Sequence, residues 1–580
     1  MSEKILIGVA WPYANGPLHL GHIAGAYLPA DIFARYHRLK GNEVLMVSGS
    51  DQHGTPITIK AEQEGKKPGE VVGEYYRQFL DSWQKLGISF DLFTTTGTAN
   101  HAEVAQDIFL TLLDRGYIYK STMSQPFCPN CQRFLPDRYV EGTCPYCQSP
   151  GARGDQCDKC GKPMTVEELI NPHCRICGST PEFRDSEHFF LKLSAFEDRL
   201  AAWVEKQDQW RPNVLNLTRR YLKEGLRDRA ITRDINWGVP VPVEGFENKR
   251  LYVWFEAVIG YLSASKEWAR STGDSEKWRS FWQGYAKGYY FIGKDNIPFH
   301  TLIWPAMLMG YGDLNLPYDV PANEFLTIEG RKLSTSQNWA VWVPDYLSRY
   351  DPDPLRYLLS INMPETGDTD FSWREFIRRN NDELVATYGN LVNRVLTFTY
   401  RNFDGHVPEH SRYGEIRKYL DINEDLDTTG MRNIVDRNSF DIIENAKEFL
   451  FLEAGDLISK CNFKQALLKI MMVARDTNQY LDGKSPWKII KEDKQAAADS
   501  LYVALYVISC LKTALYPFLP FSSQKVHEYL GFEGKVEDYG WRPTVPEPGQ
   551  KLLFPKPLFV KLDEKLAEEE SRRLGHALHK

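Results

Sequence analysis

Two histidines stand three residues apart, where a short loop of Asn, Gly and Pro leads into an expected helix. His19 and His22 then face one side of that helix, because residues at i and i+3 are neighbours on a helix surface. Imidazoles at a helix amino terminus can donate hydrogen bonds to phosphate oxygens as negative charge builds there. Gly21 lies between them and leaves room for a base or a phosphate to approach. Taken alone, the segment fits either a phosphate site or two ordinary histidines at a helix start.

Eight of the ten cysteines fall between positions 128 and 177, where they form four Cys-x-x-Cys pairs. The pairs are Cys128/Cys131, Cys144/Cys147, Cys157/Cys160 and Cys174/Cys177. One such pair can chelate a metal from a single turn, and two pairs complete a tetrahedral thiolate site. Clustering of this kind favours metal over disulfides. We expect two structural zinc ions without an open coordination position; the spacing alone leaves open which pairs combine.

A second loop with suitable chemistry, EGRKLSTSQN (Glu329–Asn338), follows the expected strand EFLTI. With HLGH near the amino end and KLSTS far behind it, the chain resembles the class I aminoacyl-tRNA synthetases, which have "HIGH" and "KMSKS" elements in this order. The resemblance implies that the loop closes over the ATP phosphates and that Lys332 neutralises the leaving pyrophosphate. Thr335 stands where the second lysine is usual, so Arg331 is the other cation nearby. We expect activity to survive this replacement.

Buried strands and a helix surround the histidine loop. KILIGVA (4–10) and NEVLMVSGSD (42–51) are apolar runs typical of parallel strands, and the residues between them have helical periodicity up to Gly41. This is a right-handed βαβ unit. A later strand ends at Gly293, and a helix follows it. In open α/β sheets ligands bind beyond the carboxyl ends of the strands, where both loops would then lie.

The expected fold class is α/β: a Rossmann-like parallel-sheet catalytic domain split by a zinc-binding insertion and followed by an α-helical bundle. A Cys-, Pro- and Gly-rich texture begins near Tyr117, and helical periodicity without strand alternation begins near Asn380. The expected segments are catalytic halves at 1–116 and 234–322, the insertion at 117–233, a loop and stem-contact region at 323–379, a bundle that binds the anticodon at 380–545, and an extension packing back at 546–580.

Four runs narrow the resemblance to the methionyl-tRNA synthetases: AWPYANGPLHLGH, GSDQHGTPI, YVWFEAVIGY and FIGKDNIPFHTLIWPAML. Methionine presents an ammonium group and a soft thioether, so its pocket needs an anion, aromatic walls and a hydrogen-bond donor near sulfur. The resemblance implies that Asp51 binds the ammonium group and that Tyr13 and His300 direct polar hydrogens at the sulfur. The remaining walls would be Ala10, Trp254, Val258, Tyr261 and Trp304. Relatives often have Leu and Pro at the positions of Trp11 and Val258.

The implied reaction has two steps. The methionine carboxylate attacks the α-phosphorus of ATP and displaces pyrophosphate, and the terminal adenosine ribose of tRNA then attacks the acyl carbon. No protein nucleophile is needed, so positioning and charge stabilisation are the catalytic means. His19, His22 and Lys332 would face the phosphates, and Mg²⁺ would accompany ATP. The implied ATP-binding set is Gly21, Gly293, Asp295, Lys332, Ser334, Thr335 and Ser336.

The resemblance also assigns tRNA contacts. Some relatives keep only the pairs matching Cys144/Cys147 and Cys157/Cys160, which implies that these share one zinc and the outer pairs the other, in a flap near the acceptor end of tRNA. Asn390 and Arg394, four apart on one helix, would bond to base edges of the CAU anticodon while Trp487 stacks on a base. For Trp487 alone, a hydrophobic contact at a helix start is the alternative. Partners would be initiator and elongator tRNA(Met), ATP and L-methionine, and a monomer is expected.

Composition excludes little. The 580 residues have a formal net charge of −7, which argues against a chain coated in basic residues. No membrane-spanning run or amino-terminal signal is apparent, so we expect a cytoplasmic protein. Two other functions stay open from the sequence: a zinc-ribbon nucleic-acid-binding protein with an inactive nucleotide fold, and the same chemistry on another amino acid.

Overall fold

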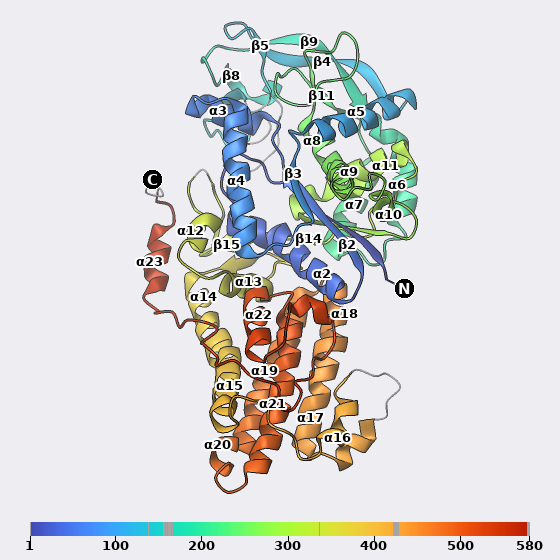
Figure 1. The fold of residues 1–580 in the computed structure, drawn as a ribbon. Coiled ribbons are helices and arrows are strands. Elements are labelled where there is room, and N and C mark those ends of the chain that lie inside the picture. Colours follow the sequence, from blue (N-terminus) through green and yellow to red (C-terminus); the bar gives the residue numbers. More distant parts are fainter. Residues whose placement is uncertain are drawn as a thin grey trace.

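The computed structural model describes residues 2–136, 139–154, 157, 159–160, 164, 166–335, 337–421 and 428–576. The molecule is elongated, with a sheet-containing part at the top of Figure 1 and a long helical bundle below it. The amino terminus lies where these two parts meet, whereas the carboxyl end returns to the side of the upper part.

The upper part is organised around one five-stranded parallel sheet in the order β14-β13-β1-β2-β3. Its strands are β1 (Lys4–Val9), β2 (Glu43–Ser50), β3 (Leu92–Thr95), β13 (Lys287–Gly293) and β14 (Ala322–Asn323). The chain runs from β1 towards β3 on one side and continues from β13 to β14 on the other. The order therefore reverses between β1 and β13, and the carboxyl ends of these two strands are the expected ligand-binding place. The predicted α/β class is confirmed.

Both faces of the sheet are covered, which explains why its strands are continuously apolar. Ile5 and Ile7 share a core with helices α2 and α4, while Leu6 and Leu45 share another with α5 and α9. These helices are α2 (Leu28–Leu39), α4 (Pro68–Leu86), α5 (Ala99–Asp114) and α9 (Gly260–Ser271). Two π-helical segments of the upper part were not predicted: Ile23–Tyr27, directly behind the histidine pair, and Phe299–Ile303.

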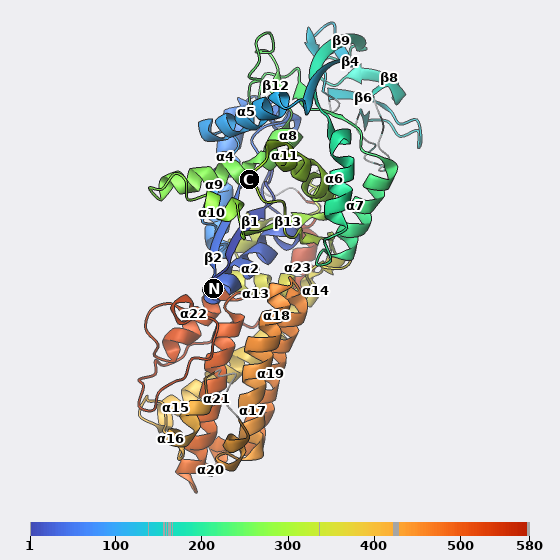
Figure 2. The ribbon, with the colours of Figure 1, turned by 90° about the vertical axis from the view of Figure 1, so that its right-hand side faces the viewer.

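An antiparallel insertion interrupts the parallel sheet after α5. Its longest strands, β4 (Ile118–Cys128) and β9 (Glu182–Leu191), pair antiparallel, and a smaller sheet in the order β7-β6-β8 carries part of the cysteine region. The smaller strands are β6 (Val140–Thr143), β7 (Ala152–Arg153) and β8 (Ile170–Cys174). Helices α6 (Glu197–Val204) and α7 (Pro212–Glu224) lead back towards the main sheet, on the side seen in Figure 2.

A small three-stranded sheet joins the two parts of the molecule. The hairpin of β15 (Leu326–Ile328) and β16 (Arg331–Lys332) presents the KLSTS loop, and β17 (Thr369–Phe371) lies parallel to β15. The helices of this region are α12 (Val343–Leu347), α13 (Pro352–Ile361) and α14 (Trp373–Arg379).

The lower part is a helical bundle. Its main helices are α15 (Asn390–Asn402), α17 (Arg437–Lys447), α19 (Phe463–Lys484), α21 (Lys494–Leu515) and α22 (Pro520–Tyr529). Within the described residues only α21 is long and apolar enough to cross a membrane, but 94% of its apolar window is buried in the bundle. It is the central helix of a water-excluding core. The chain then runs back along the bundle to α23 (Leu566–Arg573), which packs against α14.

Candidate functional site

The histidine pair lies beyond the carboxyl end of β1, at the reversal of strand order. The His19 and His22 rings stack with their centroids 3.7 Å apart, and the His19 backbone N–H donates to His22 Nδ1 at 3.2 Å. His22 Nδ1 therefore accepts, so its proton sits on Nε2 and can be donated to a ligand. His19 Nδ1 is a buried atom without a hydrogen-bond partner. Such an atom favours a polar ligand at this place.

Burial favours the neutral form of both imidazoles. Burial lowers the pKa of His22 to about 4. Burial, and then the charge of neighbouring His22, also lower the pKa of His19 well below its ordinary value. Neutral imidazoles can still donate one hydrogen bond each, and they leave the site without the electrostatic cost of buried positive charge before the anionic ligand arrives.

The KLSTS loop meets the histidine segment directly. A Cβ added at Gly21 would lie 2.6 Å from the Leu333 side chain, so a larger residue here would require that side chain to shift. Just behind the loop, Val341 O accepts from Leu20 N at 3.2 Å, and the Trp342 ring lies 6.0 Å from the His19 ring. Two segments far apart in sequence are thus held against each other at the sheet edge.

The cations of this loop face solvent. Lys332 is exposed, with its Nζ 5.3 Å from the Phe325 ring, and Arg331 stacks on Trp339 at 4.1 Å. Ser334 pairs with Trp339 through the backbone and Thr335 is exposed, whereas Ser336 lies outside the described residues. Lys332 is therefore not buried in a structural ion pair and has room to move towards a phosphate.

A cavity of about 450 Å³ opens at the same edge. Seven of the eight side chains predicted to line the methionine pocket line it: Ala10, Tyr13, Asp51, Trp254, Val258, Tyr261 and His300. Asp295, predicted for ATP, lies in the wall two residues after Gly293, so the two predicted sites adjoin. Trp11, Ala257, Asn296 and Phe299 also line it. Phe299 contacts Trp254 with ring centroids 5.1 Å apart, and its place one residue before His300 was the only signal for it.

Asp51 is one of the two carboxylates that line this cavity, the other being Asp295. Asp51 is 4% exposed, and burial together with the charge of Glu256 raises its pKa well above the ordinary value. Its Oδ1 accepts from the backbone N–H of His53 at 3.1 Å. A carboxylate whose ionised form is this costly is stabilised by an incoming cation such as an ammonium group.

A second buried carboxylate, Glu256, lies near enough to raise the pKa of Asp51, and sequence reasoning missed it. Its two carboxylate oxygens bind His53 Nδ1, at 2.7 Å, and His101 Nε2. Burial alone would raise the pKa of Glu256, but the two histidines outweigh it and lower the pKa to about 2. The residues of this network are spread over a loop and two helices, so no local motif indicates it.

Two details of the predicted wall differ from expectation. His300 Nδ1 is 2.9 Å from Asn296 O, which can only accept, so Nδ1 carries the proton and Nε2 accepts from the Tyr261 hydroxyl at 2.8 Å. The proton of His300 is thus directed away from the cavity in this arrangement. Trp304 does not line the cavity: it is fully buried, and its indole N–H donates to Tyr290 OH at 3.2 Å.

The eight clustered cysteines form two groups of four. Cys128, Cys131, Cys174 and Cys177 make one group, and Cys144, Cys147, Cys157 and Cys160 the other, so the nested pairing implied by the resemblance is the one found. Within each group all sulfurs lie within 4.8 Å of one another. Thiolates about 2.3 Å from a tetrahedral centre lie about 3.8 Å apart, so each group can hold a zinc ion. Neither site has an open position, which fits a structural role.

The predicted anticodon residues lie at the far end of the bundle. The Arg394 guanidinium stacks on Trp487 at 4.2 Å, and it also pairs with Asp482 at 3.2 Å. Trp487 lies on α20 (Pro486–Ile489), at the lower tip of Figure 1, and Asn390 is exposed one turn before Arg394. Trp487 is half-buried, so part of its ring is open to solvent.

Comparisons with known proteins agree over nearly the whole chain. Residues 5–396 match the family model described as tRNA synthetases class I (M), and residues 448–577 match the anticodon binding domain of methionyl tRNA ligase. The methionine–tRNA ligase of one strain of Dehalococcoides mccartyi is 62% identical over 575 residues, covering 99% of this chain and 100% of the relative. That of Thermomicrobium roseum is 52% identical, covering 99% of each chain. The solved Mycobacterium tuberculosis methionyl-tRNA synthetase in complex with methionyl-adenylate has a TM-score of 0.77 at 25% identity, covering 96% of this chain and 99% of that one.

Proposed function

The chain belongs to the methionyl-tRNA synthetases, the class I enzymes that couple methionine to tRNA through methionyl-adenylate, and we propose that the carboxyl edge of its parallel sheet carries out both steps. Asp51 binds the methionine ammonium group, and the aromatic side chains of the 450 Å³ cavity enclose the thioether. The methionine carboxylate then points towards the histidine pair, where the α-phosphorus of ATP lies.

The protein positions the reactants and stabilises charge. His19 and His22 donate hydrogen bonds to phosphate oxygens as the α-phosphorus is attacked, and Lys332 moves in from the exposed loop to neutralise the departing pyrophosphate. Gly21 allows the phosphates to approach the backbone once the Leu333 side chain moves with the loop, and Asp295 and Gly293 hold the adenosine. Ser334, Thr335 and Ser336 accompany Lys332 in the loop. Mg²⁺ bound by ATP supplies further positive charge.

The observation that carries this proposal is the meeting of Leu333 with Gly21 beside the cavity lined by Asp51. The test is ATP–pyrophosphate exchange without tRNA, run with each of the twenty amino acids. We expect exchange with methionine alone at low substrate concentration. Exchange with another amino acid would assign the cavity to that substrate, and tRNA binding without any exchange would favour the nucleic-acid-binding alternative.

We propose that the reaction does not need a second lysine at position 335, where this chain has Thr335. We expect Thr335→Lys to change the exchange rate by less than about tenfold, because one exposed charge near a screened phosphate contributes little beyond Lys332, Arg331 and Mg²⁺. Steady-state exchange at saturating ATP measures this. A gain of about a thousandfold would show instead that the missing lysine limits the reaction.

Each cysteine group is proposed to hold one structural zinc ion. We expect two zinc ions per chain by elemental analysis, one after Cys147→Ser, still one after Cys147→Ser with Cys160→Ser, and none after Cys147→Ser with Cys131→Ser. Loss of both ions in the first double variant would contradict the nested pairing. Because the cysteine groups lie in the insertion, metal removal should reduce tRNA charging more than methionine-dependent exchange.

Trp487 is proposed to stack on an anticodon base, with Arg394 and Asn390 bonding to base edges. We expect Trp487→Ala to lower kcat/KM for tRNA charging about 10- to 100-fold, since stacking contributes about 1–3 kcal/mol per base. Methionine-dependent exchange should stay at the wild-type rate. The exposed neighbour Lys488→Ala is the control, and an equal loss from it would point to general electrostatics rather than to stacking.

Three further proposals complete the function. We propose that initiator and elongator tRNA(Met) are both substrates, since one anticodon site serves both. We also propose that the chain acts as a monomer and works in the cytoplasm, where translation uses the methionyl-tRNA that this reaction produces. Analytical ultracentrifugation of the purified chain tests the oligomeric state.

A further inference from the structure

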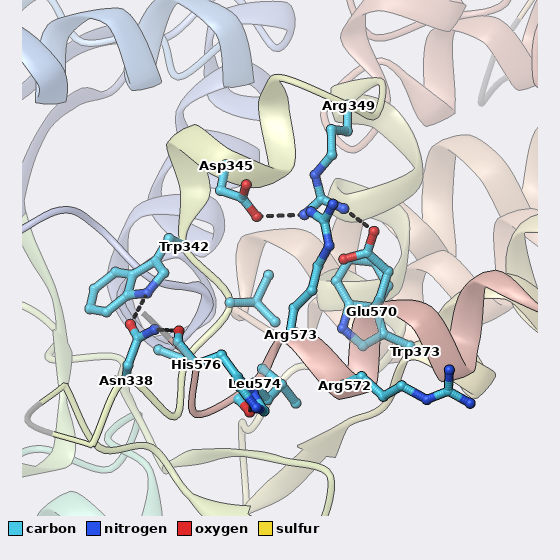
Figure 3. Close-up of a pocket in the computed structure, with 12 residues that line it drawn as sticks. Asn338, Trp342, Asp345, Arg349, Trp373, Glu570, Arg572, Arg573, Leu574 and His576 are labelled. Carbon is cyan, nitrogen blue, oxygen red and sulfur yellow. Dashed lines mark hydrogen bonds and ion pairs between the residues drawn. The ribbon is translucent and has the colours of Figure 1, made fainter. Parts of the chain in front are cut away.

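A short carboxyl-terminal segment lies against the base of the catalytic loop. We call residues 570–576 the strap; they form the end of α23 and the turn after it. Figure 3 shows the strap beside Asn338, Trp342 and Arg349, with a cavity of about 560 Å³ between them. Leu574 of the strap is buried in the main core, and side-chain and backbone hydrogen bonds join the neighbouring strap residues to this region.

The strap holds Glu329, the first residue of the loop. Ser571 Oγ donates to Glu329 Oε1 at 3.1 Å, and the backbone N–H of Trp373 donates to the same oxygen at 3.0 Å. Glu329 is a non-glycine residue in the left-handed region, with φ at 48°, at the turn between β15 and β16. Side-chain hydrogen bonds are a means of keeping such a turn in one conformation.

The strap also holds Asn338, the last residue of the loop. Asn338 O accepts from Gly575 N at 3.1 Å, and Asn338 Nδ2 donates to His576 O. Asn338 Oδ1 accepts in turn from Trp342 Nε1 at 2.7 Å, and the Trp342 ring lies against His19. Two residues thus connect the strap to the histidine pair, as the dashed lines from Asn338 in Figure 3 begin to show.

The helical end of the strap is itself anchored. Glu570 is 5% exposed, accepts from Tyr350 OH at 2.8 Å and pairs with Arg349. A buried carboxylate with two partners of this kind fixes the end of α23 on the same region that presents the loop. Both ends of the loop are therefore tied to one external segment, at Glu329 and at Asn338.

We propose that the strap is a positioning device for the Lys332 loop: it fixes the two ends of the loop so that fewer loop conformations compete with the one in which Lys332 reaches ATP. This inference rests on the proposed role of Lys332. Ordering a loop at the moment of reaction costs conformational entropy, and fixed loop ends reduce that cost. Strap residues touch no substrate; they act through Asn338 and Glu329.

Gly575→Pro tests the anchor behind the loop. Gly575 has φ at +79° and donates its N–H to Asn338, whereas proline is confined to φ near −65° and has no N–H, so the strap must leave Asn338. We expect kcat for methionine-dependent exchange to fall about five- to tenfold, with KM for methionine unchanged within twofold. We also expect trypsin to cleave after Arg331 and Lys332 about tenfold faster. Ser571→Ala tests the anchor before the loop and should give the same changes at smaller size.

Two comparisons separate positioning from general damage. Glu568→Gln lies on the exposed side of the same helix and should match the wild type in both measurements. Combining Gly575→Pro with Asn338→Ala should cost little more than Asn338→Ala alone, because both act on one contact. The proposal would be overturned if Gly575→Pro kept the wild-type cleavage rate and kcat, or if Glu568→Gln lost as much kcat as Gly575→Pro. Fully additive losses of kcat in the variant combining Gly575→Pro with Asn338→Ala would also overturn it. The rate of trypsin cleavage reports the order of the loop and does not depend on catalysis. It therefore tests the strap even if methionine-dependent exchange were absent and the proposed function had failed.

Discussion

Replacing His22 by alanine is expected to lower the rate of methionyl-adenylate formation about 10²- to 10³-fold while leaving methionine affinity unchanged within twofold. The imidazole carries its proton on Nε2 and lies at the sheet edge, so its loss removes a donor that is needed when charge builds on the phosphate oxygens. Rapid-quench measurement of the adenylate, together with equilibrium binding of methionine, gives the two quantities separately.

His22→Gln is the matched control for this change. Its side-chain amide keeps a hydrogen-bond donor in a similar place, so it should recover part of the rate that alanine loses. Equal losses of rate and of methionine affinity in His22→Ala would mean that the residue shapes the pocket and does not act on ATP.

Asp51→Asn is expected to raise KM for methionine about 100-fold or more, because the buried partner of the ammonium group loses its charge. In the wild type, burial and Glu256 raise the pKa of Asp51, so protons compete with the ammonium group for this carboxylate. KM for methionine should therefore fall as pH rises through that pKa, by up to about tenfold per pH unit. In Asp51→Asn this dependence should disappear, as a pH series of exchange kinetics would show.

Asp319→Asn is the control for Asp51→Asn. Asp319 is another buried aspartate, whose pKa burial raises to about 7, but it is not among the residues lining the methionine cavity. It should leave the pH dependence of KM in place. Asp51 would be excluded as the ammonium partner if KM for methionine did not depend on pH in the wild type. The same conclusion would follow if Asp319→Asn changed this KM as strongly as Asp51→Asn does.

Much of the fold follows from local patterns. The apolar runs at 4–10 and 42–51, with the helical segment between them, form a βαβ unit in the structure. A strand with apolar side chains on both faces requires a sheet whose two faces are both covered by helices. The Cys-x-x-Cys spacing indicated chelation without reference to the fold. The eight residues predicted for the methionine pocket came from resemblance, since Tyr13 or Trp254 alone would equally suit a protein core.

What the sequence did not indicate depends on contacts between distant segments. The proton position of His300 is set by Asn296 O and Tyr261, and Trp304 is covered by Tyr290, so neither could be read from residue type. The π-helical turn at Ile23–Tyr27 leaves no mark in apolar spacing over one turn. Glu256 and the strap both act through partners more than 100 residues away, which no local pattern contains.

The central claim is that the histidine segment and the Lys332 loop act on one ATP molecule. It is tested most directly by rapid-quench rates of methionyl-adenylate formation in His22→Ala, Lys332→Ala and the double variant. If both side chains stabilise the same transition state, the free-energy losses should be non-additive, with the double variant faster by tenfold or more than the product of the single effects predicts. A wild-type rate in Lys332→Ala, or losses that multiply without any coupling, would contradict a shared site.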